Sequence, residues 1–151
     1  MIRVQKILYP TDFSTYSNLA YFHAVSLAEL HGASLTVVYV HAPGSPGDVS
    51  HWRNLLEQVR PNNPQIPVQH VLLEGDPASE ITRYATAAGI DLIVIGTQGR
   101  TGVDRLVLGS VAERVMREAP CTVLVVKLPQ GTGCGPTPQP GSAPSPGSSE
   151  A

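Results

Sequence analysis

Five short runs of apolar and β-branched residues recur along the first 126 positions of the chain. They cover residues 6–9, 34–40, 68–73, 92–95 and 122–126. The runs are mostly apolar rather than strictly alternating, which indicates strands that are buried on both faces. Strands of this kind are typical of a parallel sheet that helices cover on both sides.

Longer segments with helical spacing separate these runs. The first carries Leu19, Phe22, Leu27 and Leu30 as its apolar positions and stops at Gly32, which predicts a helix with a glycine C-cap. The regular alternation of strand and helix predicts βαβ crossovers and therefore an α/β fold, Rossmann-like, with one parallel sheet.

Two further helix starts can be recognised from capping residues. Asp76 is followed by Pro77, a cap residue and then the residue that fits the first helical position. A last helix is predicted to begin at Ser110 and to end before Pro120. Residues 48–60 are a weaker helix candidate.

The composition changes abruptly after residue 128. Residues 129–151 are almost entirely Pro, Gly, Ser, Thr, Gln and Ala, without apolar periodicity. Such a segment buries too little apolar surface to offset its ordering entropy. The sequence therefore predicts one folded domain over residues 1–128 and a disordered tail over residues 129–151.

Charge and hydropathy argue against two classes of partner. The formal net charge is −2, so no global basic field favours nucleic acid. No apolar window approaches the roughly 20 residues that a membrane span needs. Cys121 and Cys134 form no CxxC pair, and a reducing cytoplasm is the expected location.

The glycine-rich segment after the fourth strand run is the strongest candidate for ligand chemistry. Gly96, Gly99 and Gly109 permit close approach of a ligand to the backbone. The helix start at Ser110 offers N–H groups under a positive dipole end, which suits phosphate, and Arg100 is a nearby cation. The spacing is neither that of a P-loop nor that of the dinucleotide fingerprint.

A ligand-free interpretation of the same segment is open. Ser110 with Glu113 three residues later has the spacing of a capping box, which would explain both residues without any phosphate. The glycines would then only shape the exit from a strand. The residues alone do not decide between the two interpretations.

Several motifs in their order along the chain resemble the universal stress protein family. Gly96-x2-Gly99-x9-Gly109-Ser110 looks like the ATP-binding signature of that family. The opening segment 7–14, the run 109–115 and the closing segment 119–126 are also similar to it. The resemblance extends over residues 2–127.

The resemblance implies a fold and a site. The fold would be a five-stranded parallel sheet of order 3-2-1-4-5 with helices on both faces, as in adenine-nucleotide α-hydrolases. ATP would be the ligand, with Mg or Mn held mainly by its phosphates. The implied nucleotide contacts are Pro10, Thr11, Asp12, Val40, Ala42, Gly96, Gly99, Gly109, Ser110 and Val111, to which we add Arg100. Asp12 has an alternative interpretation as a cap or turn residue.

We therefore expect an ATP-binding stress-response switch or regulator rather than a dedicated enzyme. No catalytic residue is assigned, which leaves weak ATPase activity or autophosphorylation open. One alternative is a nucleotide-free dimeric scaffold. Another is an adenylyl-transferring enzyme of the related fold, against which residues 10–14 argue, because such enzymes are expected to carry an SGGxDS-like loop there.

The last strand run suggests a partner. Val123, Leu124, Val125 and Val126 would form an apolar edge strand that invites pairing with another chain. A homodimer through this strand is expected, and the family resemblance implies the same. Residues 44–67 receive no assigned role.

Overall fold

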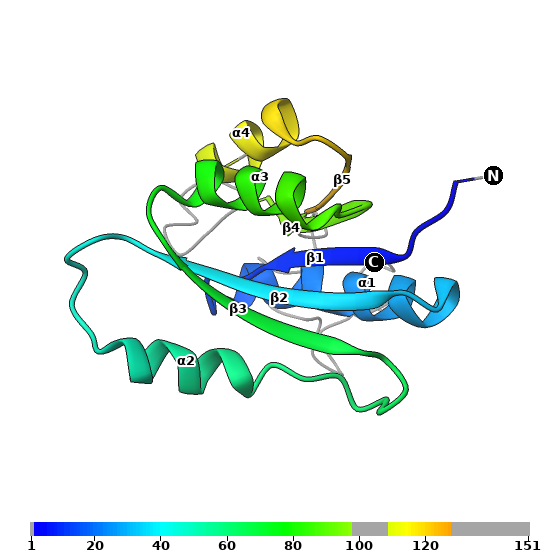
Figure 1. The fold of residues 1–151 in the computed structure, drawn as a ribbon, viewed down its shortest axis with the longest axis horizontal. Helices are drawn as coiled ribbons and strands as arrows, with labels where there is room; N and C mark the ends of the chain where they lie inside the picture. The colour runs from blue at the N-terminus through cyan, green and yellow to red at the C-terminus, as the bar shows by residue number, and fades with distance from the viewer. Residues whose placement is uncertain (1, 98–108, 128–151) are drawn as a thin grey trace, which may run out of the picture.

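The structure is a computed structural model that describes residues 2–97 and 109–127 (Figure 1). Gly99, Arg100 and the predicted tail 129–151 lie outside the described residues. The described strands are β1 (Lys6–Pro10), β2 (Ser34–His41), β3 (Val68–Glu74), β4 (Leu92–Gly96) and β5 (Thr122–Val126). The described helices are α1 (Thr15–His31), α2 (Val49–Glu57), α3 (Pro77–Ala88) and α4 (Ser110–Glu118).

The strands form one parallel sheet in the order β3-β2-β1-β4-β5, which confirms the predicted fold. β1 is central: Leu8 lies opposite Thr36 of β2 on one side and Ile93 of β4 on the other. The chain therefore runs from β1 outward to β2 and β3 on one side, and then to β4 and β5 on the other. Ligands of such sheets bind where the strand order reverses, beyond the carboxyl ends of the strands.

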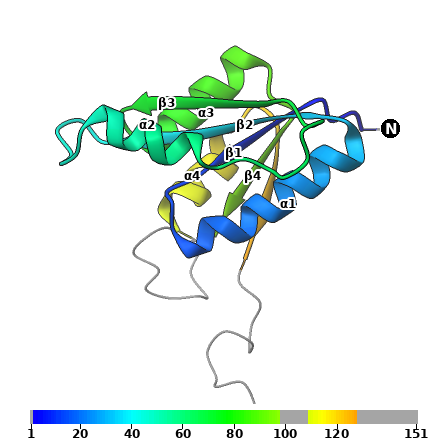
Figure 2. The same ribbon diagram turned by 90° about the horizontal axis from the view of Figure 1, so that it is seen from below.

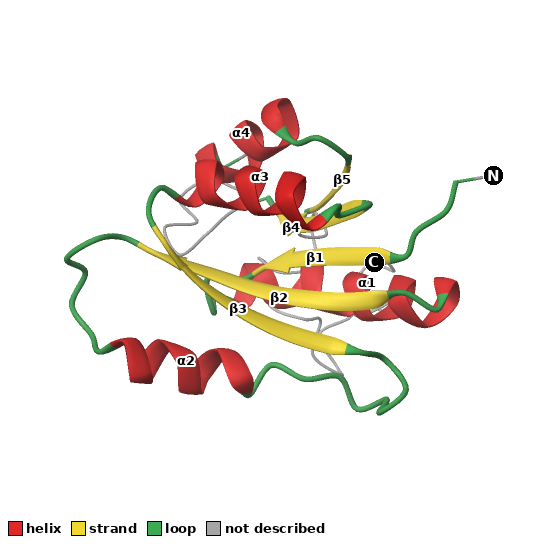
Figure 3. Cartoon of the chain, viewed as in Figure 1, coloured by secondary structure: helices red, strands yellow, loops and turns green. Residues whose placement is uncertain are grey.

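Helices cover both faces of the sheet (Figures 1, 2 and 3). α1 and α2 pack on one face, where Ile7 and Tyr9 of β1 point. α3 and α4 pack on the other face, where Leu8 points. The alternation along β1 follows from the two-residue period of a strand. No helix among the described residues is long and apolar enough to cross a membrane.

The buried face of α1 is formed by alanines rather than by all of its large apolar residues. Its buried positions are Ala20, Ala24 and Ala28, each at most 1% exposed, whereas Phe22 is 63% and Leu30 is 77% exposed. Of the apolar positions that predicted this helix, Phe22 and Leu30 therefore lie outside the core. α1 packs directly on β4 and β1, and small side chains allow that close approach.

The two edge strands are only partly covered. β1, β2 and β4 are largely buried, as their apolar runs predict. β3 and β5 are half-buried, and Leu124 in β5 is 36% exposed. Apolar residues of both edge strands pack against both core clusters, so the predicted burial on both faces holds only in part, because no described strand lies beyond them.

Candidate functional site

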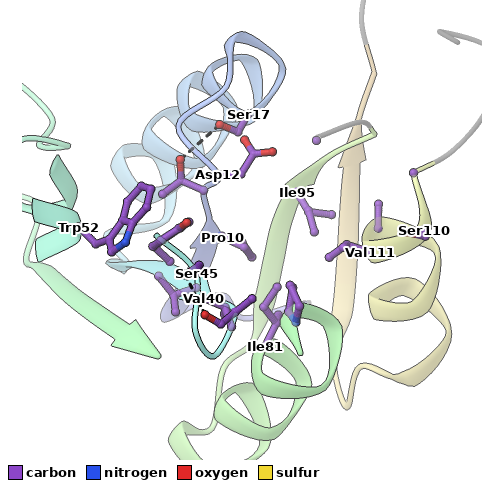
Figure 4. A pocket seen from close by; sticks show the side chains of 18 of the residues that line it. Pro10, Asp12, Ser17, Val40, Ser45, Trp52, Ile81, Ile95, Ser110 and Val111 are labelled. Atoms are coloured by element: carbon purple, nitrogen blue, oxygen red, sulfur yellow. Dashed lines mark hydrogen bonds between the residues drawn. The ribbon is translucent and has the colours of Figure 1, made fainter. Parts of the chain in front are cut away.

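A cleft of about 620 Å³ lies at the carboxyl ends of β1, β2 and β4 (Figure 4). It opens at the point where the strand order reverses, the position expected for a ligand site in this type of sheet. The start of α4 and the start of α3 close it on one side, and α2 contributes to the other.

Every described residue of the predicted site lines this one cleft. Residues from four separate segments meet there: Pro10, Thr11, Asp12, Val40, Ala42, Gly96, Gly109, Ser110 and Val111. The sheet brings them together, because the loops that follow parallel strands all emerge at the same edge. Gly99 and Arg100 fall outside the described residues.

The cleft also contains residues that were not predicted to belong to the site. The side chains of Trp52 and Ile81 are among those that Figure 4 labels. The full set of these additional residues is Ser17, Val38, Tyr39, Ser45, Pro46, Trp52, Pro77, Ile81, Ile95, Thr97 and Ala112. Trp52 lies in the segment 44–67, to which no role was assigned. The one signal in the sequence that could have pointed to it is that it is the single tryptophan of the chain.

The start of α4 forms the polar end of the cleft. Its N-cap is Gly109, in extended conformation (φ −61°, ψ 151°), and no side chain caps the helix. Ser110 is the first helical residue, and Glu113 pairs instead with Arg117 at 2.5 Å. The capping-box interpretation of Ser110 and Glu113 is therefore wrong. The first N–H groups of a helix have no intrahelical partner, so this end can receive an anion.

The other described helices begin differently. Ser14 caps α1, Asp48 caps α2 and Asp76 caps α3, each by accepting a hydrogen bond from a backbone N–H of the first turn. A side-chain cap satisfies the donors that an anion would otherwise contact. Among the described helices, α4 alone lacks such a cap, and its start lines the cleft.

The end of β4 holds the start of α4 in place. Thr97 N donates to Val126 O at 3.0 Å, and Gly109 N donates to Thr97 O. These bonds connect the last two strands to the residue that precedes α4. The polar end of the cleft is therefore fixed by the sheet itself.

The loop after β1 forms a tight turn at the opposite end of the cleft. Asp12 Oδ1 accepts from Ser14 N at 2.9 Å, and Thr11 Oγ1 accepts from Phe13 N at 3.0 Å. Phe13 has a positive φ of 63°, which is uncommon for a bulky residue. The interpretation of Asp12 as a turn residue is confirmed, and the same residue also lines the cleft.

Buried hydroxyl groups support this turn. Thr11 and Ser17 are 7% and 5% exposed, and their hydroxyl oxygens lie 3.3 Å apart. Ser17 Oγ donates to Ser14 O at 3.0 Å, and Tyr9 Oη donates to Ser17 O at 2.7 Å. Burial raises the pKa of Tyr9, so this hydroxyl keeps its proton and its role as a donor. The turn is thereby anchored to the core.

Comparisons with known proteins agree with the fold. The family model described as the universal stress protein family matches residues 3–127. A universal stress protein of Methanocaldococcus jannaschii is 38% identical over 143 residues, covering 83% of this chain and 84% of that protein. A solved universal stress protein from Lactobacillus plantarum has a TM-score of 0.70 and 27% identity, covering 83% of this chain and 99% of its own.

Two further solved structures contain nucleotides. One is a universal stress protein in complex with cAMP, with a TM-score of 0.65, 22% identity and coverage of 81% of this chain and 96% of that one. The other is from Archaeoglobus fulgidus in complex with dAMP, with a TM-score of 0.64, 23% identity and coverage of 84% and 100%. At these identities the likeness concerns the fold. The match over residues 3–127 and the 38% identical relative nevertheless establish the relationship, and this chain belongs to the universal stress protein family.

Proposed function

We propose that the cleft binds ATP or a closely related adenine nucleotide, and that the bound nucleotide biases the partner interactions of a stress-response regulator. One observation carries this proposal. The glycine-capped start of α4 opens on the same cleft as Asp12 and the end of β2. A ligand with a phosphate group at one end and a nucleoside at the other suits that arrangement.

The phosphate groups would bind at the start of α4. The N–H groups of Ser110 and Val111 and the positive end of the helix dipole favour a negative charge there. Gly96 and Gly109 add no side chain that would keep phosphate oxygens away from the backbone. Gly99 and Arg100 belong to the same proposed phosphate site.

The nucleoside would lie by Asp12 and the end of β2. A carboxylate accepts hydrogen bonds from ribose hydroxyl groups, and Thr11 and Asp12 lie beside the apolar surface of Pro10. The backbone near Val40 and Ala42 has donors and acceptors for the edge of adenine. The complexes of related folds with cAMP and dAMP support an adenine nucleotide as the ligand.

Hydrolysis is proposed to be slow at most. Phosphoryl transfer to water requires a positioned water molecule and charge stabilisation. Glu113, the described carboxylate closest in sequence to the phosphate end, pairs with Arg117. Within residues 2–97 and 109–127 no three His, Cys, Asp or Glu side chains gather into a metal site. A Mg or Mn ion would therefore be held mainly by the phosphates.

The proposed oligomer is a homodimer through β5. This strand is an edge of the sheet, and Leu124 is partly exposed on it. Pairing of Val123, Leu124, Val125 and Val126 with the same strand of a second copy would cover the apolar edge. A cytoplasmic location is part of the same proposal.

Calorimetric titration of the full chain with ATP and AMP tests the proposed ligand. We expect saturable heat for ATP and a rise of the unfolding temperature that increases with ATP concentration, because a ligand that binds only the folded state stabilises it. The absence of both effects would falsify nucleotide binding. Measurement of pyrophosphate in the same mixture distinguishes binding from adenylyl transfer, which predicts its release.

A further inference from the structure

Three aromatic side chains from distant segments meet at the nucleoside end of the cleft. Phe13 follows β1, Tyr39 lies in β2 and Trp52 lies in α2. The Trp52 ring centroid is 4.9 Å from that of Tyr39 and 6.2 Å from that of Phe13, whose ring is nearly parallel to it at 10°. Tyr39 and Trp52 both line the cleft. The cluster therefore forms an aromatic wall.

A glycine in the loop before α2 lies directly against this wall. Gly47 has φ +124°, and a Cβ placed on it would lie 3.0 Å from Trp52 Nε1 and 3.3 Å from Trp52 Cε2. A Cβ at this position would push the indole by a few tenths of an ångström, and the positive φ disfavours a side chain as well. Gly44, in the same loop, has φ +74° but meets no heavy atom within 4 Å of such a Cβ. Both glycines have a positive φ, which a residue with a side chain rarely adopts, and of the two only Gly47 lies against the indole.

The indole is therefore held in place by its neighbours. Phe13 and Tyr39 pack on it from the sheet side, and the backbone of Gly47 approaches it from the loop. A side chain that is ordered before binding loses little conformational entropy when a ligand arrives. Trp52 thus offers a fixed, largely apolar surface at the cleft.

The wall lies away from the phosphate end. In Figure 4, Trp52 stands on one side of the cleft, while Ser110 and Val111 stand on the opposite side with Ile95 between. A nucleotide whose phosphates contact the start of α4 would direct its base toward Trp52. Aromatic side chains and nucleobases attract one another through their large flat surfaces.

We propose that Trp52 is a specificity-determining residue, against whose indole the base of the bound nucleotide packs, so that the cleft prefers a purine nucleotide. This inference rests on the proposed nucleotide binding. A purine covers more of the indole than a pyrimidine does, and a phosphate chain without a base covers none of it. Gly47 is a positioning residue, because it acts on the base through the indole.

Titration of four variants with ATP, CTP and inorganic tripolyphosphate tests the assignment. Trp52→Ala is expected to weaken ATP binding by about tenfold, to reduce the preference for ATP over CTP, and to leave tripolyphosphate binding unchanged. Trp52→Phe keeps an aromatic surface and should lose less ATP affinity than Trp52→Ala. Gly47→Ala should also weaken ATP binding. The matched Gly44→Ala should bind ATP as the unmodified chain does.

The outcomes separate the two proposals. If the unmodified chain binds ATP and Trp52→Ala binds it equally well with the same ATP to CTP ratio, the role of Trp52 is overturned while nucleotide binding stands. Equal losses for ATP and tripolyphosphate also overturn it, since they indicate a structural effect. If the unmodified chain binds tripolyphosphate but not ATP, the proposed nucleotide function itself fails. Quenching of the single tryptophan by ATP but not by tripolyphosphate supports the contact.

Discussion

Arg114 in α4 donates from Nη1 to the Asp76 carboxylate at 2.7 Å, and Nη2 donates to Ser79 Oγ at 3.0 Å. Asp76 is also the N-cap of α3 and accepts from the backbone N–H and the hydroxyl of Ser79. One carboxylate thus caps a helix and pairs with a cation of the next helix. Because Pro77 and Ser110 line the cleft, this contact holds the two helix starts that face the ligand site.

Asp76 is expected to make stability depend on pH. Hydrogen bonds from Ser79, with a smaller contribution from Arg114, hold the pKa of Asp76 below its ordinary value of 3.8. A lowered pKa in the folded state gives stability that is present above the unfolded pKa and is lost as the pH falls through the folded pKa. Asp76→Asn should remove this part of the pH dependence, which urea unfolding between pH 7 and pH 3 would measure.

The same variant separates charge from capping. Asparagine caps a helix about as well as aspartate, so Asp76→Asn should keep most of the stability at pH 7. Asp76→Ala removes both the cap and the acceptor for Arg114 and should be the less stable of the two. Equal acid sensitivity of Asp76→Asn and the unmodified chain would argue against a role for this carboxylate.

Gly109 is the position at which phosphate binding can be tested most directly. Its extended backbone accepts any residue, and Gly109→Asp would supply the missing cap of α4. We expect the free protein to gain a few tenths of a kcal/mol, about 0.3. ATP affinity should fall by about tenfold or more, because the carboxylate would repel the phosphates across a few ångströms. Calorimetric titration and urea unfolding provide both quantities.

Gly109→Asn is the matched control for charge. It has nearly the same size and capping ability as aspartate but no charge. We expect a similar gain in stability and a smaller loss of ATP affinity. If both variants bind ATP as tightly as the unmodified chain, the phosphates do not lie at the start of α4.

Leu124 tests the proposed dimer. Leu124→Lys places a charge on the exposed edge of β5 and should weaken self-association by about tenfold or more, since like charges would face each other across the two-fold axis. Equilibrium sedimentation at micromolar concentration would measure the change. Met116→Lys alters another exposed apolar side chain, 51% exposed on α4, and serves as the control. An unmodified chain that is already monomeric contradicts the dimer.

The alanine face of α1 makes a separate prediction about stability. Ala24 is fully buried against the sheet, so Ala24→Leu should overpack this contact and cost about 1–3 kcal/mol. Leu30→Ala, on the exposed side of the same helix, should change the free energy of unfolding by no more than about 0.5 kcal/mol. Urea unfolding compares the two. A larger effect at Leu30 would mean that α1 is rotated about its axis.

Much of the fold was predictable because parallel strands buried in a sheet consist mostly of apolar and β-branched residues. The runs 6–9 and 92–95 became β1 and β4 within one residue. The face of α1 was not predictable in the same way. Alanine carries little hydrophobic signal, so the apolar positions that predict this helix do not reveal that Ala20, Ala24 and Ala28 form its contact with the sheet.

The candidate site was predictable only in part. The glycines and Asp12 were found through their spacing and the family resemblance, and the rule on strand ends located them together. The start of α4 at Ser110 was predicted correctly, but a Ser and a Glu three residues apart do not reveal whether a side chain caps the helix, so the capping box stayed an open alternative. Trp52 could not be assigned, because its place in the cleft depends on contacts with Phe13 and Tyr39, which lie far away in the sequence.

The strand order has a consequence for the size of the ligand. The end of β2 and the end of β4 are separated by β1 alone, and neighbouring strands of a sheet lie roughly 4.8 Å apart. The carboxyl ends of β2 and β4 are thus about two strand spacings apart, roughly 10 Å. Backbone hydrogen bonds set that distance, so it cannot stretch to suit a longer or shorter molecule. A ligand that contacts the ends of both strands must therefore match this fixed distance.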